Sequence, residues 1–128
     1  MARYLSQEWL DRHRELAAGQ PEWPGVSARL QYVVTGTPDG DVRYHTVVRD
    51  GRLVEAALGD IADPDVTFTQ GYEVNLQILR GDLDANAAFM QGRVKVAGDM
   101  GKVLDLLPLT SDPDYRRVQE QLVAETDL

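Results

Sequence analysis

The sequence lacks cysteine altogether across its 128 residues, so disulfide bonds and thiolate chemistry are excluded. It also lacks a long apolar run. No segment approaches the roughly 20 apolar residues of a membrane-spanning helix, and residues 1–8 reach charged side chains before a signal peptide could form. A chain of this length fits a single domain, residues 1–128, with a core of its own. We therefore expect one domain located in the cytoplasm.

Positive charge is scarce. The 13 basic residues, among which only Lys95 and Lys102 are lysines, stand against 21 acidic residues and leave a net charge of -8. Such a chain repels the phosphates of nucleic acids and the anionic faces of membranes. We expect no nucleic-acid partner and no stable membrane attachment.

Groups that usually carry catalysis or bind metals are also few. The two histidines, His13 and His45, have no metal-ligand spacing around them, and His45 falls on the polar register of its strand. Neither glycine-rich nucleotide-binding spacing is present, and no serine has a base beside it in a recognisable motif. We therefore expect no metal site, no cofactor and no assigned catalytic residue.

A helix is predicted over residues 6–18, with Ser6 as its N-cap and Glu8 in its first turn. Leu5 and Leu10 suit a hydrophobic staple, which fixes how the chain enters a helix. Two prolines and a glycine then interrupt residues 20–25, so this segment is a connector.

Between residues 28 and 58 the apolar side chains recur at every second position, which indicates half-buried strands. Leu30, Tyr32 and Val34, for example, alternate with the polar Arg29 and Gln31. The pair Asp50-Gly51 is a strong signal for a two-residue hairpin turn. We expect three strands in an antiparallel meander here, and a fourth short strand over 66–68.

The second half of the chain has clear signals for where helices begin and end. Asp84 is the predicted N-cap of a short helix that Gly92 ends, and a strand follows in which Val94 and Val96 face inward. Asp99 caps the next helix, which Pro108 should end. The last helix, 113–124, has Asp112 as its N-cap and Pro113 in its first turn.

The run Ala88-Phe89-Met90-Gln91-Gly92-Arg93-Val94-Lys95-Val96-Ala97-Gly98-Asp99-Met100-Gly101 resembles the signature of the sterol carrier protein family. The resemblance is most specific from Val66 to Leu107. It implies an α+β domain in which a mostly antiparallel five-stranded sheet has helices packed on one face. It further implies an apolar tunnel between the two layers.

Residues 72–79 are the segment where pattern and resemblance differ. Tyr72, Val74, Leu76 and Ile78 alternate with polar residues as in a strand. Tyr72, Leu76 and Leu79 also satisfy helical spacing, and Gly81 is a natural stop. The family resemblance implies a helix, and we predict one.

The resemblance implies a ligand cavity whose lining comes from separate elements, and apolar residues of suitable size occur in each of them. The terminal helix is amphipathic and is expected to act as a lid on this cavity. The predicted lining residues are Tyr32, Tyr44, Phe68, Leu76, Phe89, Met90, Met100, Leu104, Leu107, Tyr115, Val118 and Leu122.

Three functions fit these observations. The chain is first expected to bind an apolar small molecule, such as a sterol, a fatty acid or an acyl conjugate, as a soluble carrier or presenter. The fold also occurs as an accessory module, so a homodimer or a partner enzyme is an alternative. The third alternative is a small enzyme acting on a hydrophobic substrate, with His45, Tyr44 or a buried carboxylate as acid or base.

Overall fold

The computed structural model describes residues 2–19, 22–110 and 112–127. Its centre is a five-stranded sheet in the order β4-β3-β2-β5-β6. The parallel pair β2–β5 makes the sheet mixed, and the other neighbours are antiparallel. The strands are β2 (Ala28–Thr37), β3 (Gly40–Arg49), β4 (Arg52–Leu58), β5 (Val66–Gly71) and β6 (Lys95–Gly98).

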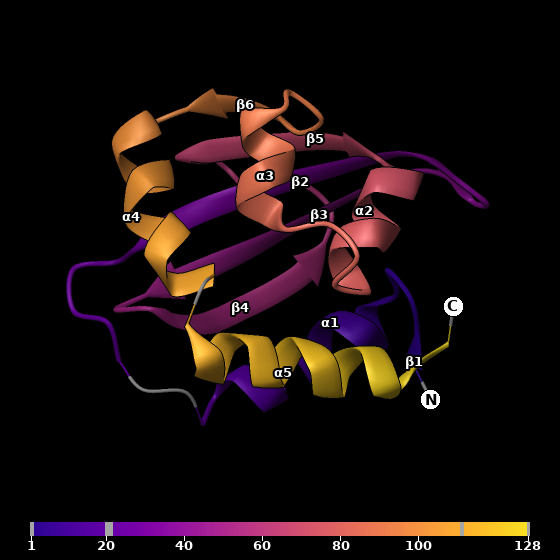
Figure 1. The fold of residues 1–128 in the computed structure, drawn as a ribbon, viewed down its shortest axis with the longest axis horizontal. Coiled ribbons are helices and arrows are strands. Elements are labelled where there is room, and N and C mark those ends of the chain that lie inside the picture. The colour runs from indigo at the N-terminus through magenta and orange to yellow at the C-terminus, as the bar shows by residue number, and fades with distance from the viewer. Residues whose placement is uncertain (1, 20–21, 111, 128) are drawn as a thin grey trace.

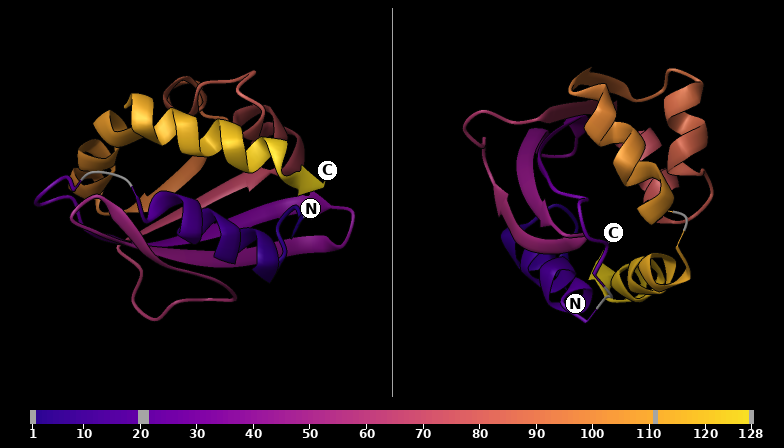
Figure 2. Two further views of the ribbon diagram at one scale, coloured as in Figure 1. Left: turned by 90° about the horizontal axis from the view of Figure 1, so that it is seen from below. Right: turned by 90° about the vertical axis from the view of Figure 1, so that its left-hand side faces the viewer.

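Helices cover one face of this sheet, as Figures 1 and 2 show, so the expected α+β architecture is confirmed. α1 packs beside the edge strand β4 and against α5. The helices are α1 (Gln7–Ala17), α2 (Tyr72–Leu79), α3 (Ala85–Met90), α4 (Met100–Thr110) and α5 (Pro113–Ala124).

The predicted N-caps begin these helices as expected. The side chain of Ser6 accepts a hydrogen bond from the backbone N–H of Trp9, Asp84 accepts one from Ala87, and Asp112 accepts one from Asp114. These bonds satisfy backbone N–H groups that have no partner inside the helix. Residues 72–79 are helical, so the strand-like alternation there was misleading.

Pro108 does not end its helix, contrary to the sequence prediction. α4 continues to Thr110 with the proline inside it. Because proline has no backbone N–H, the helix lacks the hydrogen bond that residue 108 would donate to the carbonyl of Leu104. The helix tolerates this loss because Leu106 and Leu109, on either side of Pro108, are both buried against the sheet.

A hairpin turn and a close approach between two strands fix the register of the sheet. Asp50 and Gly51 both have positive φ, 50° and 77°, as a tight hairpin between β3 and β4 requires. Gly98 at the end of β6 has φ 123°, and a Cβ there would lie 2.2 Å from the backbone oxygen of Asp65. Only glycine lets β6 approach β5 this closely.

The outer face of the sheet carries mostly polar side chains, with one departure from the predicted alternation. Gln31 was expected to face solvent, but it is only 3% exposed. Its side-chain amide donates to the backbone oxygen of Tyr44 (3.0 Å) and accepts from the backbone N–H of Ile61 (2.9 Å). The loop that contains Ile61 therefore covers Gln31 and satisfies its polar atoms.

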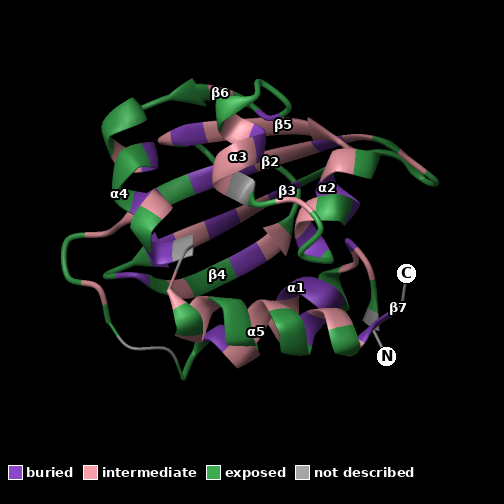
Figure 3. Cartoon of the chain, viewed as in Figure 1, coloured by how far each residue is buried: buried purple, intermediate pink, exposed green. Residues whose placement is uncertain are grey.

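The buried residues of the strands and helices are purple in Figure 3. Those of the inner face of the sheet and its helices form two clusters. One joins α1 and α5 to the sheet through residues such as Trp9, Leu10 and Leu122. The other joins α4 to the sheet through residues such as Leu30 and Val103. The side chain of Tyr32 packs against both clusters, so it lies at their junction.

The two ends of the described chain lie side by side (Figure 1). β1 (Ala2–Arg3) and β7 (Thr126–Asp127) pair in parallel as a small second sheet. Near it, the indole N–H of Trp9 donates to the side-chain oxygen of Thr126 at 3.1 Å. The C-terminal end of α5 is thereby tied to α1.

Candidate functional site

A cavity of about 250 Å³ lies between the inner face of the sheet and the helices. All five helices and all five strands of the central sheet contribute side chains to its wall. β4 contributes Leu53 and β6 contributes Val96, and each of the other elements contributes at least two side chains. The wall is mainly aromatic and aliphatic, as in pockets that bind small organic molecules.

A row of three aromatic rings forms the sheet side of the cavity. Tyr32 on β2 pairs across the sheet with Tyr44 on β3 and with Phe68 on β5. The Tyr32 ring is stacked on Tyr44 at a centroid distance of 4.7 Å and on Phe68 at 5.2 Å. Because even-numbered side chains in these strands share one face, the register alone brings the three rings together.

Six of the twelve side chains predicted from the sequence line this cavity. The three rings of the aromatic row are joined by Phe89 from α3, Leu107 from α4 and Tyr115 from α5. These residues come from six different elements, which the fold brings to one place.

Three predicted residues lie on the outside instead. Met90 is 81% exposed, Leu104 is 62% exposed and Met100 is 44% exposed. A helical residue next to an inward-facing one is rotated by about 100°. Because Phe89 and Val103 face inward, their neighbours Met90 and Leu104 point away, and Met100 is the exposed first residue of α4.

The other three predicted residues do not line the cavity either. Leu76 is buried in the structure, and Val118 is half-buried. Leu122 is 1% exposed and belongs to the cluster that joins α5 to α1. Of the predicted stripe on α5, only Tyr115 therefore reaches the cavity.

The cavity wall also contains polar side chains that were not predicted from the sequence. At one end, the amide of Gln70 donates to the side-chain oxygen of Asn75, whose own amide nitrogen donates to the hydroxyl of Tyr4. Elsewhere in the wall, Nε2 of His13 lies 3.1 Å from Nε2 of Gln119. His13 stands four residues after the buried Trp9, a helical spacing that marks it as inward-facing.

The titratable groups of the wall are uncharged near neutral pH. Burial lowers the pKa of His13 to about 4. Burial also raises the pKa of Tyr4, Tyr32, Tyr44 and Tyr115 above the usual value for tyrosine. Among the described residues, no arginine, lysine, aspartate or glutamate lines the cavity.

His45, considered as an acid or base for a hydrophobic substrate, lies away from the cavity. Its Nδ1 is 3.0 Å from the backbone oxygen of Gly59, on the outer side of the sheet. In the described part of the chain, no group of three or more potential ligands is placed to hold a metal ion. None of the helices there is long and apolar enough to cross a bilayer.

Comparison with solved structures identifies the fold. The crystal structure of a sterol carrier protein 2 matches with a TM-score of 0.71 at 13% identity, covering 98% of this chain and 100% of the other. Sterol carrier protein 2 like 2 from Aedes aegypti matches with a TM-score of 0.62 at 23% identity, covering 79% and 92%.

Part of a larger enzyme is similar as well. The inverting sec-alkylsulfatase from Pseudomonas sp. is 26% identical with a TM-score of 0.51, and the match covers 75% of this chain but 14% of that enzyme. No curated protein matches the chain at a significant level.

The family comparison covers the cavity-forming part of the chain. The model of the SCP-2 sterol transfer family matches residues 8–111, which run from α1 through α4. This range includes the whole aromatic row and most of the cavity wall. The chain belongs to the SCP-2 sterol transfer family.

Proposed function

We propose that this protein binds an apolar small molecule in the cavity between its sheet and helices, and acts as a soluble carrier or presenter of that molecule in the cytoplasm. The observation that carries the proposal is the cavity itself: about 250 Å³, walled by aromatic and aliphatic side chains from all five helices and all five strands of the central sheet. An apolar cavity of about 150 Å³ already holds benzene. This one has room for a larger group.

Family membership supports lipid binding or transfer in general. One similar structure is described as palmitated sterol carrier protein 2 like 2 from Aedes aegypti, at 23% identity and a TM-score of 0.63. We propose that the aromatic row and the helix residues Phe89, Leu107 and Tyr115 contact the apolar part of the ligand in this chain.

A second candidate function rests on the alkylsulfatase comparison. That enzyme contains a segment similar to this chain as a small part of its length. The protein would then serve as an accessory or dimerisation module beside a partner enzyme. Size-exclusion chromatography with light scattering separates a monomeric carrier from a stable dimer.

Binding of a homologous series of primary alcohols tests the carrier function. Each added CH₂ that is fully buried contributes about 0.8 kcal/mol, or about fourfold in Kd. Affinity measured by displacement of a fluorescent lipid should therefore climb with chain length and stop climbing when the cavity is full. The absence of saturable binding at micromolar concentrations for every chain length would refute the proposal.

A further inference from the structure

We propose that the cavity selects lipids with an uncharged hydrogen-bonding head group, and that the Tyr4–Asn75–Gln70 network binds that head group. The inference rests on the proposed function, because it names the class of ligand that the same cavity takes. A long-chain alcohol, a sterol or a neutral ester belongs to this class. An ionised fatty acid does not.

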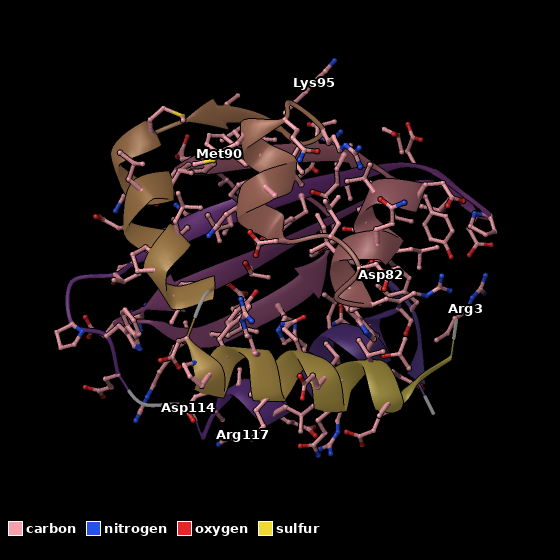
Figure 4. All side chains as sticks on the ribbon, viewed as in Figure 1. Arg3, Asp82, Met90, Lys95, Asp114 and Arg117 are labelled. Atoms are coloured by element: carbon pink, nitrogen blue, oxygen red, sulfur yellow. The ribbon has the colours of Figure 1, made fainter. Side chains whose placement is uncertain are left out.

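The first argument is the absence of a counter-charge. The described residues that line the cavity include no arginine or lysine, and the one basic side chain, His13, is neutral near pH 7. An ionised carboxylate moved from water into this wall would lose its hydration and gain no cation. Figure 4 shows the side chains of Arg3 and Lys95 pointing outward, at the periphery of the fold.

The second argument is the chemistry of the polar end. The hydroxyl of Tyr4 accepts from Asn75, so its own hydrogen remains for a ligand acceptor. The amide nitrogen of Gln70 donates to Asn75, so its carbonyl oxygen remains for a ligand donor. One donor and one acceptor match a hydroxyl, which both donates and accepts. An ester and a carboxylate both only accept, from the Tyr4 hydroxyl, but the carboxylate would also bring a negative charge against the carbonyl oxygen of Gln70.

The third argument is that the network is held in place before a ligand arrives. Asn75 is 6% exposed, and it stands in the first turns of α2, where Gly71 joins this helix to β5. Gln70 is the next-to-last residue of β5, and it pairs with Val34 in the sheet. Polar groups fixed in this way need no ordering on binding.

The test compares hexadecanol, methyl palmitate and palmitate by displacement of the same neutral fluorescent lipid at pH 6.5, 7.5 and 8.5. If only the protonated acid binds, palmitate should weaken about tenfold per pH unit, or about 100-fold across the range. The alcohol and the ester should not change. The titratable groups of the wall, Tyr4, His13, Tyr32, Tyr44 and Tyr115, stay uncharged throughout this range.

A variant that introduces a positive charge tests which end of the cavity binds the head group. Lysine in Gln70→Lys still donates to Asn75 and adds a cation at the polar end. At pH 7.5 this variant should bind palmitate at least tenfold more tightly than the wild type does. Thr67→Lys is the matched control, because it adds the same charge to β5 on the opposite face, three residues away. It should leave all three affinities unchanged.

The outcomes separate the two proposals. Palmitate that binds as tightly as hexadecanol at pH 8.5 overturns the selection for uncharged heads and leaves the carrier function standing. Failure of all three lipids to bind overturns the carrier function and this inference with it. If Gln70→Lys does not fold, the pH series on the wild type still tests the selection for uncharged head groups. If it folds and its affinities equal those of the Thr67→Lys control, the assignment of the Tyr4–Asn75–Gln70 network is overturned.

Discussion

His13 is a single side chain whose environment has a measurable effect on stability. It lies on α1 with its ring 5.8 Å from the ring of Trp9 and hydrogen-bonds to Gln119 of α5. The ring is half-buried and lines the cavity, so protonating it there is unfavourable. Its pKa falls to about 4, below the value of about 6.5 expected in the unfolded chain.

The sign of the pH effect follows from this pKa difference. Between pH 6.5 and 4 the unfolded chain binds more protons at His13 than the folded chain does, so the folded state loses stability as pH falls. The full contribution is present above pH 6.5. From pH 7 to 4.5 we expect His13 to account for a loss of about 2 kcal/mol in the free energy of unfolding.

Urea unfolding at the two pH values measures this loss. The control is His13→Gln, which keeps a hydrogen-bonding side chain opposite Gln119 but cannot titrate. The variant should lose about 2 kcal/mol less than the wild type over the same pH interval. Equal losses in the two proteins would show that the His13 ring is as free to protonate in the folded protein as in the unfolded chain.

At the scale of elements, α5 is held firmly at one end and less firmly at the other. Its C-terminal half carries the fully buried Leu122, and Arg12 of α1 makes a two-armed contact with Glu125 at 3.1 and 3.2 Å. Nearer its N-terminal end it contributes Tyr115 to the cavity wall, and near its middle Gln119. A lid formed by α5 would therefore open from its N-terminal end.

Hydrogen exchange is the measurement for this element. Amides of residues 116–120 should exchange faster than those of 122–125 in the free protein, and they should slow when ligand is added. Deletion of residues 113–128 should destabilise the fold, because Leu122 leaves a core position worth about 2–5 kcal/mol. Uniform exchange along α5, or a truncated protein of wild-type stability, would contradict the unequal anchoring.

Local chemistry in the sequence was enough to predict most elements. N-cap residues predicted four helix starts, those after Ser6, Asp84, Asp99 and Asp112. The Asp50-Gly51 turn and period-two alternation predicted three strands, because each signal depends on neighbours along the chain. Residues 72–79 needed the family resemblance, since their pattern fits a helix and a strand equally. Pro108 was misjudged because tertiary packing overrides a local helix breaker.

The cavity was only partly predictable. The lining residues of the sheet were predicted correctly because strand alternation shows which side chains share a face. Met90 and Leu104 were predicted wrongly because the orientation of each helix about its axis, which turns them outward, is set by tertiary packing. The polar residues of the wall were not predicted, because Tyr4 lies 66 residues or more from Gln70 and Asn75 in the sequence. Only the fold brings the three side chains together. No sequence spacing marks such a group.

At the scale of the whole molecule, charge and apolar surface are segregated. The net charge is -8, and the ion pairs among the described residues lie on exposed side chains such as Arg43 with Asp60. The interior between the sheet and the helices carries none of that charge in its described wall. This division suits a protein that stays dispersed in water while enclosing an apolar molecule.

The central claim is that the ligand occupies the space between the sheet and the helices, and a pair of adjacent substitutions tests it most directly. Val96 and Ala97 are neighbours on β6; Val96 lines the cavity beside Phe68, whereas Ala97 is exposed. Val96→Trp adds a large ring to the cavity, and Ala97→Trp adds the same ring to the outside. The measurement is the Kd for a fluorescent long-chain alcohol, with circular dichroism to establish that both variants are folded. We predict binding at least tenfold weaker in Val96→Trp and unchanged in Ala97→Trp; equal, wild-type affinity in both folded variants would contradict the account.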